Sequence, residues 1–314
     1  MDRLGELIGK SAVMQHVYYL LKRAAASTLP VLLQGETGTG KELAARTLHQ
    51  LSGATGAFIP IHCGTIPETL FENILFGHAK GAYTGAETVH LGMVSQAEHG
   101  TLFLDEIAKL TRSQQIKLLR LLSEHEYYAV GSGTLSQFHG RFIFATNQNL
   151  EGLVAQDKFQ EDLWYRIKVL TITLPSLRQR YDDIPLLLHH FLEQRKLRPK
   201  EINPQIFTWI QQRTELHGWP GNVRELKNVF SRFIEFDDPL CDSQWYTLSH
   251  DPAGQYLPLA DVLANLEARY ILEVLSNCQG DKECAAMILG ISHRTLDRKC
   301  AEYSIYTENQ KKGT

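Results

Sequence analysis

The amino-acid sequence predicts an α/β fold with a parallel β-sheet, followed by two regions that are entirely helical. Apolar runs of strand length alternate with helical patterns over residues 1–175, as in sheets whose strands are joined by helices. A glycine-rich turn follows the apolar run at residues 29–33, and two acids follow the run at residues 101–104. Because ligands of such sheets bind at the carboxyl ends of the strands, we expect the functional site there.

The composition is that of a globular protein with a sizeable core. Apolar residues make up 43% of the 314 residues and charged residues 21%, and this length predicts about two or three domains. No apolar run approaches the roughly 18–20 residues of a membrane span, and residues 1–6 lack a secretory signal's apolar core. The five cysteines form no CxxC pair, which favours reduced thiols in the cytoplasm and argues against structural zinc. The net charge of −3 excludes a uniformly basic nucleic-acid binder but allows a local basic patch.

The glycine-rich segment at residues 35–42 has the GxxxxGK spacing of a phosphate-binding loop. Its glycines allow tight turns, so that backbone N–H groups and a helix N-terminus face the anion. Lys41 would place its charge on the β- and γ-phosphates, whereas Glu42 stands where a Ser or Thr hydroxyl usually meets Mg²⁺. An ordinary glycine turn is the alternative, which this spacing after a strand disfavours. The predicted nucleotide contacts are Gly35, Glu36, Thr37, Gly38, Thr39, Gly40, Lys41 and Glu42.

The elements around this loop alternate as the fold requires. Residues 11–28 predict a helix, and residues 58–61 a second short strand. Residues 69–76 and 112–124 are helical in pattern, and the second of these segments is amphipathic. Residues 141–147 predict another buried strand.

Two strand ends carry further polar residues that suit nucleotide hydrolysis. The strand within residues 100–106 ends in Asp105 and Glu106. In P-loop NTPases this arrangement puts the first carboxylate near Mg²⁺ and the second near the attacking water. Asn147 ends a later strand, where it could sense the γ-phosphate or orient the water.

These segments together resemble the AAA+ domains of bacterial sigma-54-dependent transcriptional activators. The motifs GETGTGKE, GAYTGA, GTLFLDEI, ATN, LPSLRQR and WPGNVREL occur in that family's order, over about residues 5–236. The resemblance implies an AAA+ P-loop NTPase with a parallel sheet and an α-helical lid, which uses ATP and Mg²⁺. GAYTGA matches the family's most specific motif, the GAFTGA loop that contacts sigma-54. The implied contact residues are Gly81, Ala82, Tyr83, Thr84, Gly85 and Ala86.

The residues of that loop suit a contact made in only one nucleotide state. Glycines flank Ala82, Tyr83 and Thr84, which predicts a mobile segment with an exposed aromatic ring and a hydroxyl at its tip. Tyr83 replaces the family's Phe, so it keeps the ring and adds a polar group. We therefore expect the loop's function to be retained.

Several positions depart from the family's pattern. His62 stands where the family usually has an Asn that is thought to restrain the catalytic Glu, and it could do so by a pH-dependent hydrogen bond. Ala79 and Ala129 stand where Glu and Arg often occur, so we expect no charge contact between these two segments.

Residues 159–166 resemble FREDLYYR, whose two arginines reach the neighbouring subunit's nucleotide. Arg166 matches one of them, and Gln160 fills the other position. An arginine finger can contribute about 10³–10⁵ in rate, and a neutral Gln cannot supply its charge. Two interpretations stay open: the homo-oligomer hydrolyses ATP slowly or needs a paralogous subunit, or Arg166 suffices. Turnover of Gln160→Arg would distinguish them.

The two helical regions resemble a lid and a DNA-binding domain. Residues 176–236 resemble the AAA+ lid, in which Arg224 matches a sensor arginine that touches the γ-phosphate; a surface salt bridge is the alternative. Residues 237–258 predict a linker, because they contain Pro and Gly and little periodicity. Residues 259–306 resemble a Fis-type helix-turn-helix domain, with a dimerisation bundle as the alternative, and residues 307–314 form a tail. The predicted DNA contacts are Ser292, which also suits an N-cap, His293, Arg294, Thr295, Arg298 and Lys299.

The first interpretation is an ATP-hydrolysing ring, expected to be a hexamer, that binds enhancer DNA and remodels sigma-54 RNA polymerase for promoter opening. Catalysis would involve Glu106, Arg166 and Asn147, with Asp105 on Mg²⁺ and Arg224 on the nucleotide. A second interpretation is a DNA-bound regulator that uses nucleotide only for assembly or needs a paralogous co-subunit. A third, a remodeller such as a replication initiator, is disfavoured by GAYTGA. If Met1 is the natural start, control comes from a separate protein, expression level or a co-subunit, because the family usually carries a sensor domain there.

Overall fold

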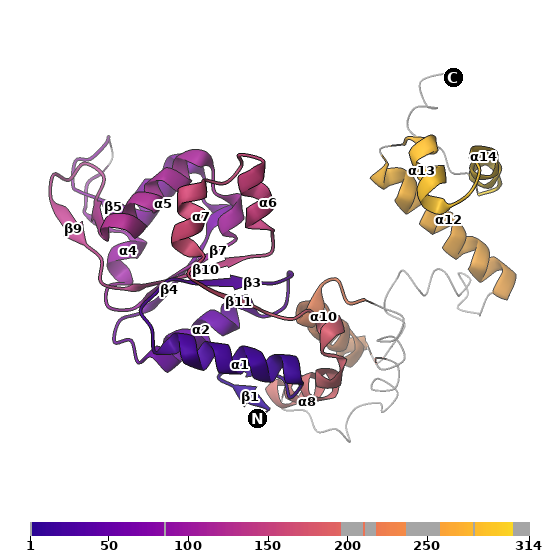
Figure 1. Ribbon diagram of the computed structural model, residues 1–314, viewed down its shortest axis with the longest axis horizontal. Coiled ribbons are helices and arrows are strands. Elements are labelled where there is room, and N and C mark those ends of the chain that lie inside the picture. Colours follow the sequence, from indigo (N-terminus) through magenta and orange to yellow (C-terminus); the bar gives the residue numbers. More distant parts are fainter. Residues whose placement is uncertain are drawn as a thin grey trace. The chain divides into compact units, whose positions relative to one another are not determined.

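The computed structural model divides into two compact units, Met1–Ile234 and Glu235–Thr314, each of which is described by itself (Figure 1). The structure describes residues 2–84, 86–195, 210, 218–236, 258–278 and 280–303. The predicted linker therefore lies almost wholly outside the described residues, as does the tail. Within the described part of the chain, no helix is both long and apolar enough to cross a membrane.

A five-stranded parallel sheet forms the centre of the first unit and confirms the predicted fold class. Its strand order is β11-β3-β10-β7-β4, and every neighbouring pair is parallel. All six residues of β10 are buried, which is the expected pattern for a strand between two others in a sheet covered on both faces. The sequence analysis did not predict β11. The strands are β3 (Val31–Gln34), β4 (Phe58–His62), β7 (Thr101–Asp105), β10 (Arg141–Thr146) and β11 (Leu170–Thr173).

Helices cover both faces of this sheet (Figure 1). Val31 and Leu33 pack with α1 (Ala12–Ala25) and α2 (Lys41–Ser52), whereas Leu32 belongs to the core on the opposite face. This alternation follows from the two-residue period of a strand. The opposite face carries α3 (Phe71–Phe76), α4 (Met93–Gln96), α5 (Arg112–Glu124), α6 (Leu150–Ala155) and α7 (Glu161–Ile167).

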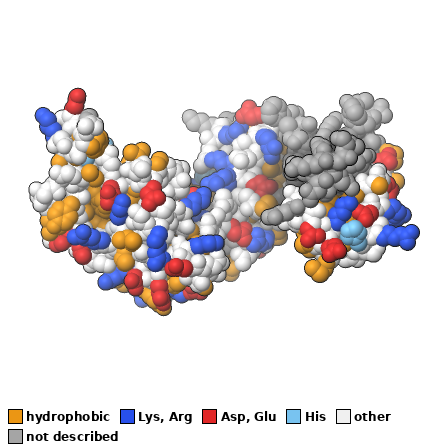
Figure 2. All heavy atoms as spheres, turned by 90° about the horizontal axis from the view of Figure 1, so that it is seen from above, with side chains coloured by type: hydrophobic (Ala, Val, Ile, Leu, Met, Phe, Trp, Pro, Cys, Tyr) orange, Lys and Arg blue, Asp and Glu red, His pale blue; other side chains and the backbone are white. Residues whose placement is uncertain are grey.

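Short elements connect these layers. Three two-stranded antiparallel pairs flank the main sheet: β1 (Arg3–Leu4) with β2 (Leu7–Ile8), β5 (Gly77–His78) with β6 (His90–Leu91), and β8 (Glu126–Tyr128) with β9 (Leu135–Gln137). The 3-10 helices are η1 (Cys63–Thr65), η2 (Glu68–Leu70), η3 (Ile107–Lys109), η4 (Leu177–Gln179) and η5 (Tyr181–Asp183). Figure 2 shows acidic and basic side chains interspersed over the visible face, in agreement with the small net charge.

The lid follows the sheet within the same unit. Its described helices are α8 (Ile184–Gln194) and α10 (Asn222–Phe236), which share an apolar core with fully buried Trp219 and Phe230. Ile8 and Leu177 join this core, so the lid packs against segments of the α/β part.

The described helices of the second unit are α12 (Leu259–Asn277), α13 (Lys282–Leu289) and α14 (His293–Glu302). Asp281 and Ser292 cap α13 and α14 through their side-chain oxygens, and Gly290 ends α13 with a left-handed φ of 67°. Leu296 and Ala285 lie in the small core that these helices share. The predicted helix-turn-helix arrangement, with Ser292 as an N-cap, is therefore confirmed.

Candidate active site

The glycine-rich loop lies between the end of β3 and the start of α2, as its spacing predicts. Gly38 and Gly40 have φ values of 80° and 103°, which favour glycine. At Gly38 the space is also restricted, because a Cβ atom there would lie 2.1 Å from the carbonyl oxygen of Gly221 in the lid. The loop is therefore shaped by the lid as well as by its own turns.

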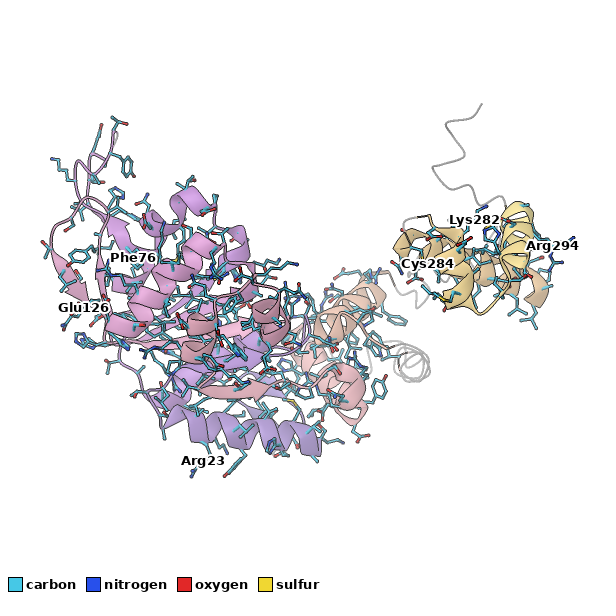
Figure 3. All side chains as sticks on the ribbon, turned by 45° about the horizontal axis from the view of Figure 1, so that its top comes forward. Arg23, Phe76, Glu126, Lys282, Cys284 and Arg294 are labelled. Atoms are coloured by element: carbon cyan, nitrogen blue, oxygen red, sulfur yellow. The ribbon has the colours of Figure 1, made fainter. Side chains whose placement is uncertain are left out.

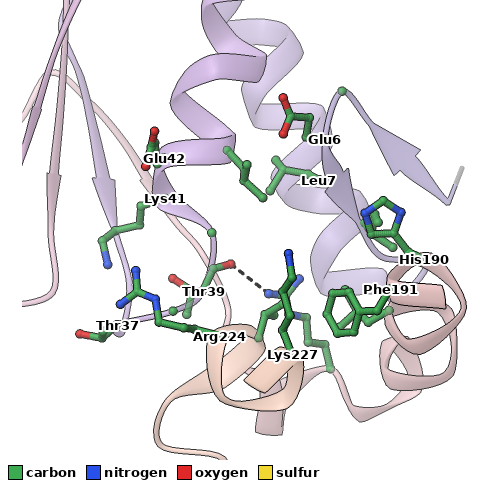
Figure 4. Close-up of a pocket in the computed structure, with 18 of the residues that line it drawn as sticks. Glu6, Leu7, Thr37, Thr39, Lys41, Glu42, His190, Phe191, Arg224 and Lys227 are labelled. Atoms are coloured by element: carbon green, nitrogen blue, oxygen red, sulfur yellow. Dashed lines mark hydrogen bonds between the residues drawn. The ribbon is translucent and has the colours of Figure 1, made fainter. Parts of the chain in front are cut away.

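Lys41 is the first residue of α2, and its side chain turns back to the loop. Its Nζ donates to the carbonyl oxygens of Gly35 at 2.8 Å and Glu36 at 3.0 Å. Burial lowers the pKa of Lys41, the nearby Asp105 carboxylate opposes this shift, and the positive charge of Arg224 adds to it. Lys41 and Arg224 project toward the same space (Figure 4). Two cations that converge beside the glycine-rich loop and the N-terminus of α2 suit a polyphosphate.

These residues line a pocket of about 530 Å³, a volume in the range of small-ligand sites. One end is polar and contains the loop, the strand-end acids and Arg224. The other end is largely apolar and suits the base of a nucleotide. Its lining includes Leu7, Ile8, Leu187 and Phe191, with His190 and Lys227 nearby (Figure 4).

The acid pair lies at the end of β7, on the rim of the same pocket. Asp105 Oδ1 accepts a hydrogen bond from the N–H of Glu106 at 2.8 Å, and Oδ2 lies 3.6 Å from His62 Nδ1. Its carboxylate faces the pocket near Lys41, so it fits the oxygen ligand that Mg²⁺ prefers. Glu42 is engaged elsewhere, because its carboxylate accepts from Arg46 Nη2 at 2.8 Å.

Glu106 has an unusual backbone conformation and a cationic partner. Its φ and ψ of 55° and 42° are left-handed, and its carboxylate is 2.9 Å from Lys109 Nζ. His62, which could have restrained Glu106 by a hydrogen bond, contacts Asp105 in this structure.

Asn147 connects the end of β10 to the loop. Its Nδ2 donates to Thr37 Oγ1 at 3.1 Å, and its side chain lines the pocket. This position suits the predicted sensing of a γ-phosphate, because a ligand in the loop would change the surroundings of Thr37.

The lid contributes contacts that the sequence analysis did not single out. The Glu36 carboxylate pairs with both terminal nitrogens of Arg178 and accepts from Asn222 Nδ2 at 3.1 Å. The hydrogen bonds from Arg178, and then from Asn222, lower the pKa of Glu36. The N–H of Val223 donates to Gly38 O at 3.1 Å, so the lid binds the loop backbone directly. The sequence feature that could have indicated these contacts is the charged Glu36 in the loop, together with the arginines of the LPSLRQR motif.

Buried Arg180 makes a further link to the loop. Its Nη2 donates to Thr39 O at 3.1 Å, and it lines the pocket. Burial lowers the pKa of this guanidinium, while neighbouring Asp183 opposes that shift. Arg180 thus holds the loop backbone at Thr39.

The GAYTGA segment lies in the loop between β5 and β6. Tyr83 is 47% exposed, and its ring packs 5.1 Å from that of His78 while its hydroxyl accepts from Asn73 Nδ2 at 3.4 Å. Gly85 lies outside the described residues, and Ala86 is buried at the base of the loop.

The segment around Ala129 lies beside this loop and is joined to its base through the backbone. The N–H of Ala79 donates to Val130 O at 2.9 Å, and the N–H of Val130 donates to Gly77 O at 2.8 Å. Backbone hydrogen bonds therefore join these two segments, in which Ala79 and Ala129 replace the charged residues that are common in the family.

The two positions of the FREDLYYR-like segment have different environments. Arg166 is exposed in the last turn of α7 and does not line its own chain's nucleotide pocket. Gln160 is partly buried at the N-cap of α7, its N–H donates to Gln115 Oε1 at 2.7 Å, and its own Oε1 is buried without a partner among the described residues.

The predicted DNA contacts on α14 also differ among themselves. Arg294 and Arg298 are exposed (Figure 3 labels Arg294). Lys299 Nζ is 2.6 Å from Glu267 Oε1, and only 19% of its side chain is exposed. His293 Nδ1 lies 3.0 Å from an oxygen of Asp297. In the cap of α14, the N–H of Thr295 donates to Ser292 Oγ at 3.2 Å.

Comparisons with known proteins agree with this geometry. The sigma-54 interaction domain matches residues 7–173, the AAA+ ATPase lid domain matches residues 178–250, and the Fis family of bacterial regulatory proteins matches residues 262–303. The regulatory protein AtoC of Escherichia coli is 37% identical over 321 residues, which cover 96% of this chain and 68% of AtoC. The DNA-binding transcriptional regulator NtrC of Salmonella typhimurium is 38% identical over 331 residues, covering 95% of this chain and 70% of NtrC.

A solved structure extends the similarity to the three-dimensional fold. NtrX from Brucella abortus in complex with ATP has a TM-score of 0.66 at 30% identity, and the match covers 97% of this chain and 71% of NtrX. The chain therefore belongs to the sigma-54-dependent transcriptional activators, as an AAA+ ATPase with a helical lid and a Fis-type helix-turn-helix domain.

Proposed function

We propose that this protein forms an ATP-hydrolysing ring, a hexamer, which binds enhancer DNA and remodels sigma-54 RNA polymerase to permit promoter opening. The observation that carries the proposal is the pocket that brings Lys41, Arg224 and the strand-end acids together beneath the lid. A binding-only regulator would need neither the acid pair nor the exposed GAYTGA loop.

The hydrolytic step follows from the residues around the pocket. Lys41 and Arg224 bind the phosphates, and Asp105 would hold Mg²⁺, which would supply positive charge that neutralises the phosphates. Glu106 accepts a proton from water as the water oxygen attacks the γ-phosphorus and the bond to the β-phosphate oxygen breaks. Asn147, through its bond to Thr37, detects the loss of the γ-phosphate.

The result of hydrolysis would reach the polymerase through the GAYTGA loop. The exposed Tyr83 ring supplies an apolar contact at the loop tip. Because Ala79 and Val130 are joined by a backbone hydrogen bond, the loop and the segment at residues 128–133 would move together. The exposed arginines of α14 would hold the protein on DNA, chiefly through phosphates.

Arg166 would act on the nucleotide of the neighbouring subunit, which can be tested by mixing variants. Lys41→Ala removes a subunit's own phosphate contact, and Arg166→Ala removes the charge that it provides to its neighbour. Each variant alone should be inactive, whereas mixed assemblies should recover part of the ATPase activity. An equimolar mixture with no more activity than the separate variants would contradict action between subunits.

The decisive experiment is in-vitro transcription from a sigma-54 promoter. We expect transcripts with ATP and none with a non-hydrolysable analogue, because remodelling consumes ATP. A Thr84→Ala variant should hydrolyse ATP without producing transcripts. Equal transcription with the analogue, or no effect of ATP in the presence of an active polymerase, would refute the proposed function.

A further inference from the structure

We propose that Lys109 is a positioning residue that holds the Glu106 carboxylate away from the attacking water and so limits the turnover of ATP. The inference rests on the proposed ATPase function, and it assigns a restraint to a residue outside the nucleotide pocket. Lys109 does not line that pocket, whereas Glu106 does.

The geometry of Glu106 brings its side chain to Lys109. Glu106 precedes η3 in a left-handed conformation, and Lys109 is the last residue of that single turn. Residues three apart in a helical turn lie on the same side, which allows the 2.9 Å contact between Glu106 Oε2 and Lys109 Nζ. No other ion pair of Glu106 occurs within the part of the chain that the structure describes.

The paired side chains lie over the backbone of η1. A Cβ atom on Gly64 would be 2.7 Å from Glu106 Oε2 and 2.8 Å from Lys109 Cδ. The carboxylate and the lysine stem therefore use space that exists only because residue 64 has no side chain. This position gives the pair a defined location rather than a loose contact in solvent.

His62, the other candidate for a restraint, is engaged with a different acid. Its Nδ1 lies 3.6 Å from Asp105 Oδ2, on the carboxylate that precedes Glu106. The cation that contacts the catalytic carboxylate is thus Lys109. The proposed restraint requires this ion pair to loosen before the Glu106 carboxylate, which already lines the pocket, takes a proton from water.

The expected size of the effect follows from the exposure of the pair. The side chains of Lys109 and Glu106 are 49% and 38% exposed, and such ion pairs are weak. Lys109→Met should raise kcat roughly two- to five-fold. KM and ATP affinity should stay unchanged, because Lys109 itself does not line the nucleotide pocket. The ratio of variant to wild-type kcat should fall toward one as salt is raised, because salt screens an exposed pair.

Gly64→Ala tests the same restraint without changing a charge. The added methyl would displace the flexible ends of both side chains, so this variant should also raise kcat. Lys109→Arg keeps the ion pair and should retain the wild-type rate. Arg112→Met is the matched control, because it removes the exposed ion pair between Arg112 in α5 and Asp157 in the turn after α6, and it should leave kcat unchanged.

Two results would overturn the inference. One is a Lys109→Met kcat that equals or falls below that of the wild type in protein whose melting temperature and KM are normal. The other is an increase with Gly64→Ala but not with Lys109→Met, since the charge would then be irrelevant. A wild-type protein that binds but does not hydrolyse ATP would instead refute the proposed function, so the two failures are distinguishable.

Discussion

The contact between lid and loop makes Asn222 a residue whose removal should be costly. Asn222 is fully buried, and its Oδ1 accepts from the N–H of Leu177 at 2.7 Å. Its Nδ2 donates to Thr37 O at 3.0 Å and to Glu36 Oε2 at 3.1 Å. Its φ of 52° is left-handed, a conformation that Asn tolerates better than most residues. We expect Asn222→Ala to destabilise the first unit and weaken ATP binding.

The magnitude can be estimated from these contacts. Leaving the N–H of Leu177 buried without an acceptor costs about 1–3 kcal/mol, and losing the two donated bonds costs about 1 kcal/mol more. Alanine at a left-handed φ adds about 1 kcal/mol. The sum is about 3–5 kcal/mol, which for a unit of this size lowers the melting temperature by about 6–20 °C.

Thermal unfolding and equilibrium ATP binding would measure both effects. Asn222→Gly should recover about 1 kcal/mol relative to Asn222→Ala, because glycine accepts the backbone conformation but restores no hydrogen bond. Asn149→Ala is the control, since Asn149 is an exposed cap of α6 whose loss costs about 1 kcal/mol and should not change ATP binding. If Asn222→Ala lowers the melting temperature no more than Asn149→Ala does, the assigned contacts do not stabilise the fold.

Three further predictions concern charged side chains. The hydrogen bonds from Arg178 lower the pKa of Glu36 in the folded protein. Near pH 4 the unfolded chain therefore binds more protons than the folded chain. The pair stabilises the fold above the ordinary pKa of Glu, and this stabilisation is lost as pH falls through the lowered pKa. Because the pair is exposed, Arg178→Ala should lower stability only slightly in urea unfolding at pH 7, and this difference should disappear in acid. An equal loss at pH 7 and pH 3 would contradict the assignment. Arg294→Ala should reduce the slope of log affinity for DNA against log salt by about one. Lys299→Ala should leave that slope unchanged and lower stability instead, because the Lys299 ammonium is paired with Glu267. A reduced slope for this variant would show that Lys299 contacts a DNA phosphate.

Local patterns were enough to predict the elements that carry the nucleotide site. The GxxxxGK spacing, the strand ending in Asp105 and Glu106 and the strand before Asn147 each depend on neighbours along the chain. Helix α5 occupies residues 112–124, as its periodicity predicts. Strand β11 was missed because its four residues alternate too briefly to be distinguished from an irregular segment.

The contacts among these elements depended on the tertiary structure. Glu36 and Asn222 are 186 residues apart in sequence, and no local pattern indicates that a carboxylate in the loop and an amide in the lid share a hydrogen bond. The environment of Gln160 also depended on packing. Its residue type suggested a lost arginine finger, but no local pattern indicated that it would be partly buried and hydrogen-bonded to Gln115.

The sequence alone therefore determined the chemistry of the site, because phosphate-binding turns and strand-end acids are encoded over a few consecutive residues. Whether a charged side chain is available for that chemistry is a different matter. Lys299 and Arg294 look equivalent in sequence, yet one is paired with Glu267 on another helix and the other is exposed. Burial and pairing arise only when distant segments pack, since both depend on which atoms exclude water from a given group.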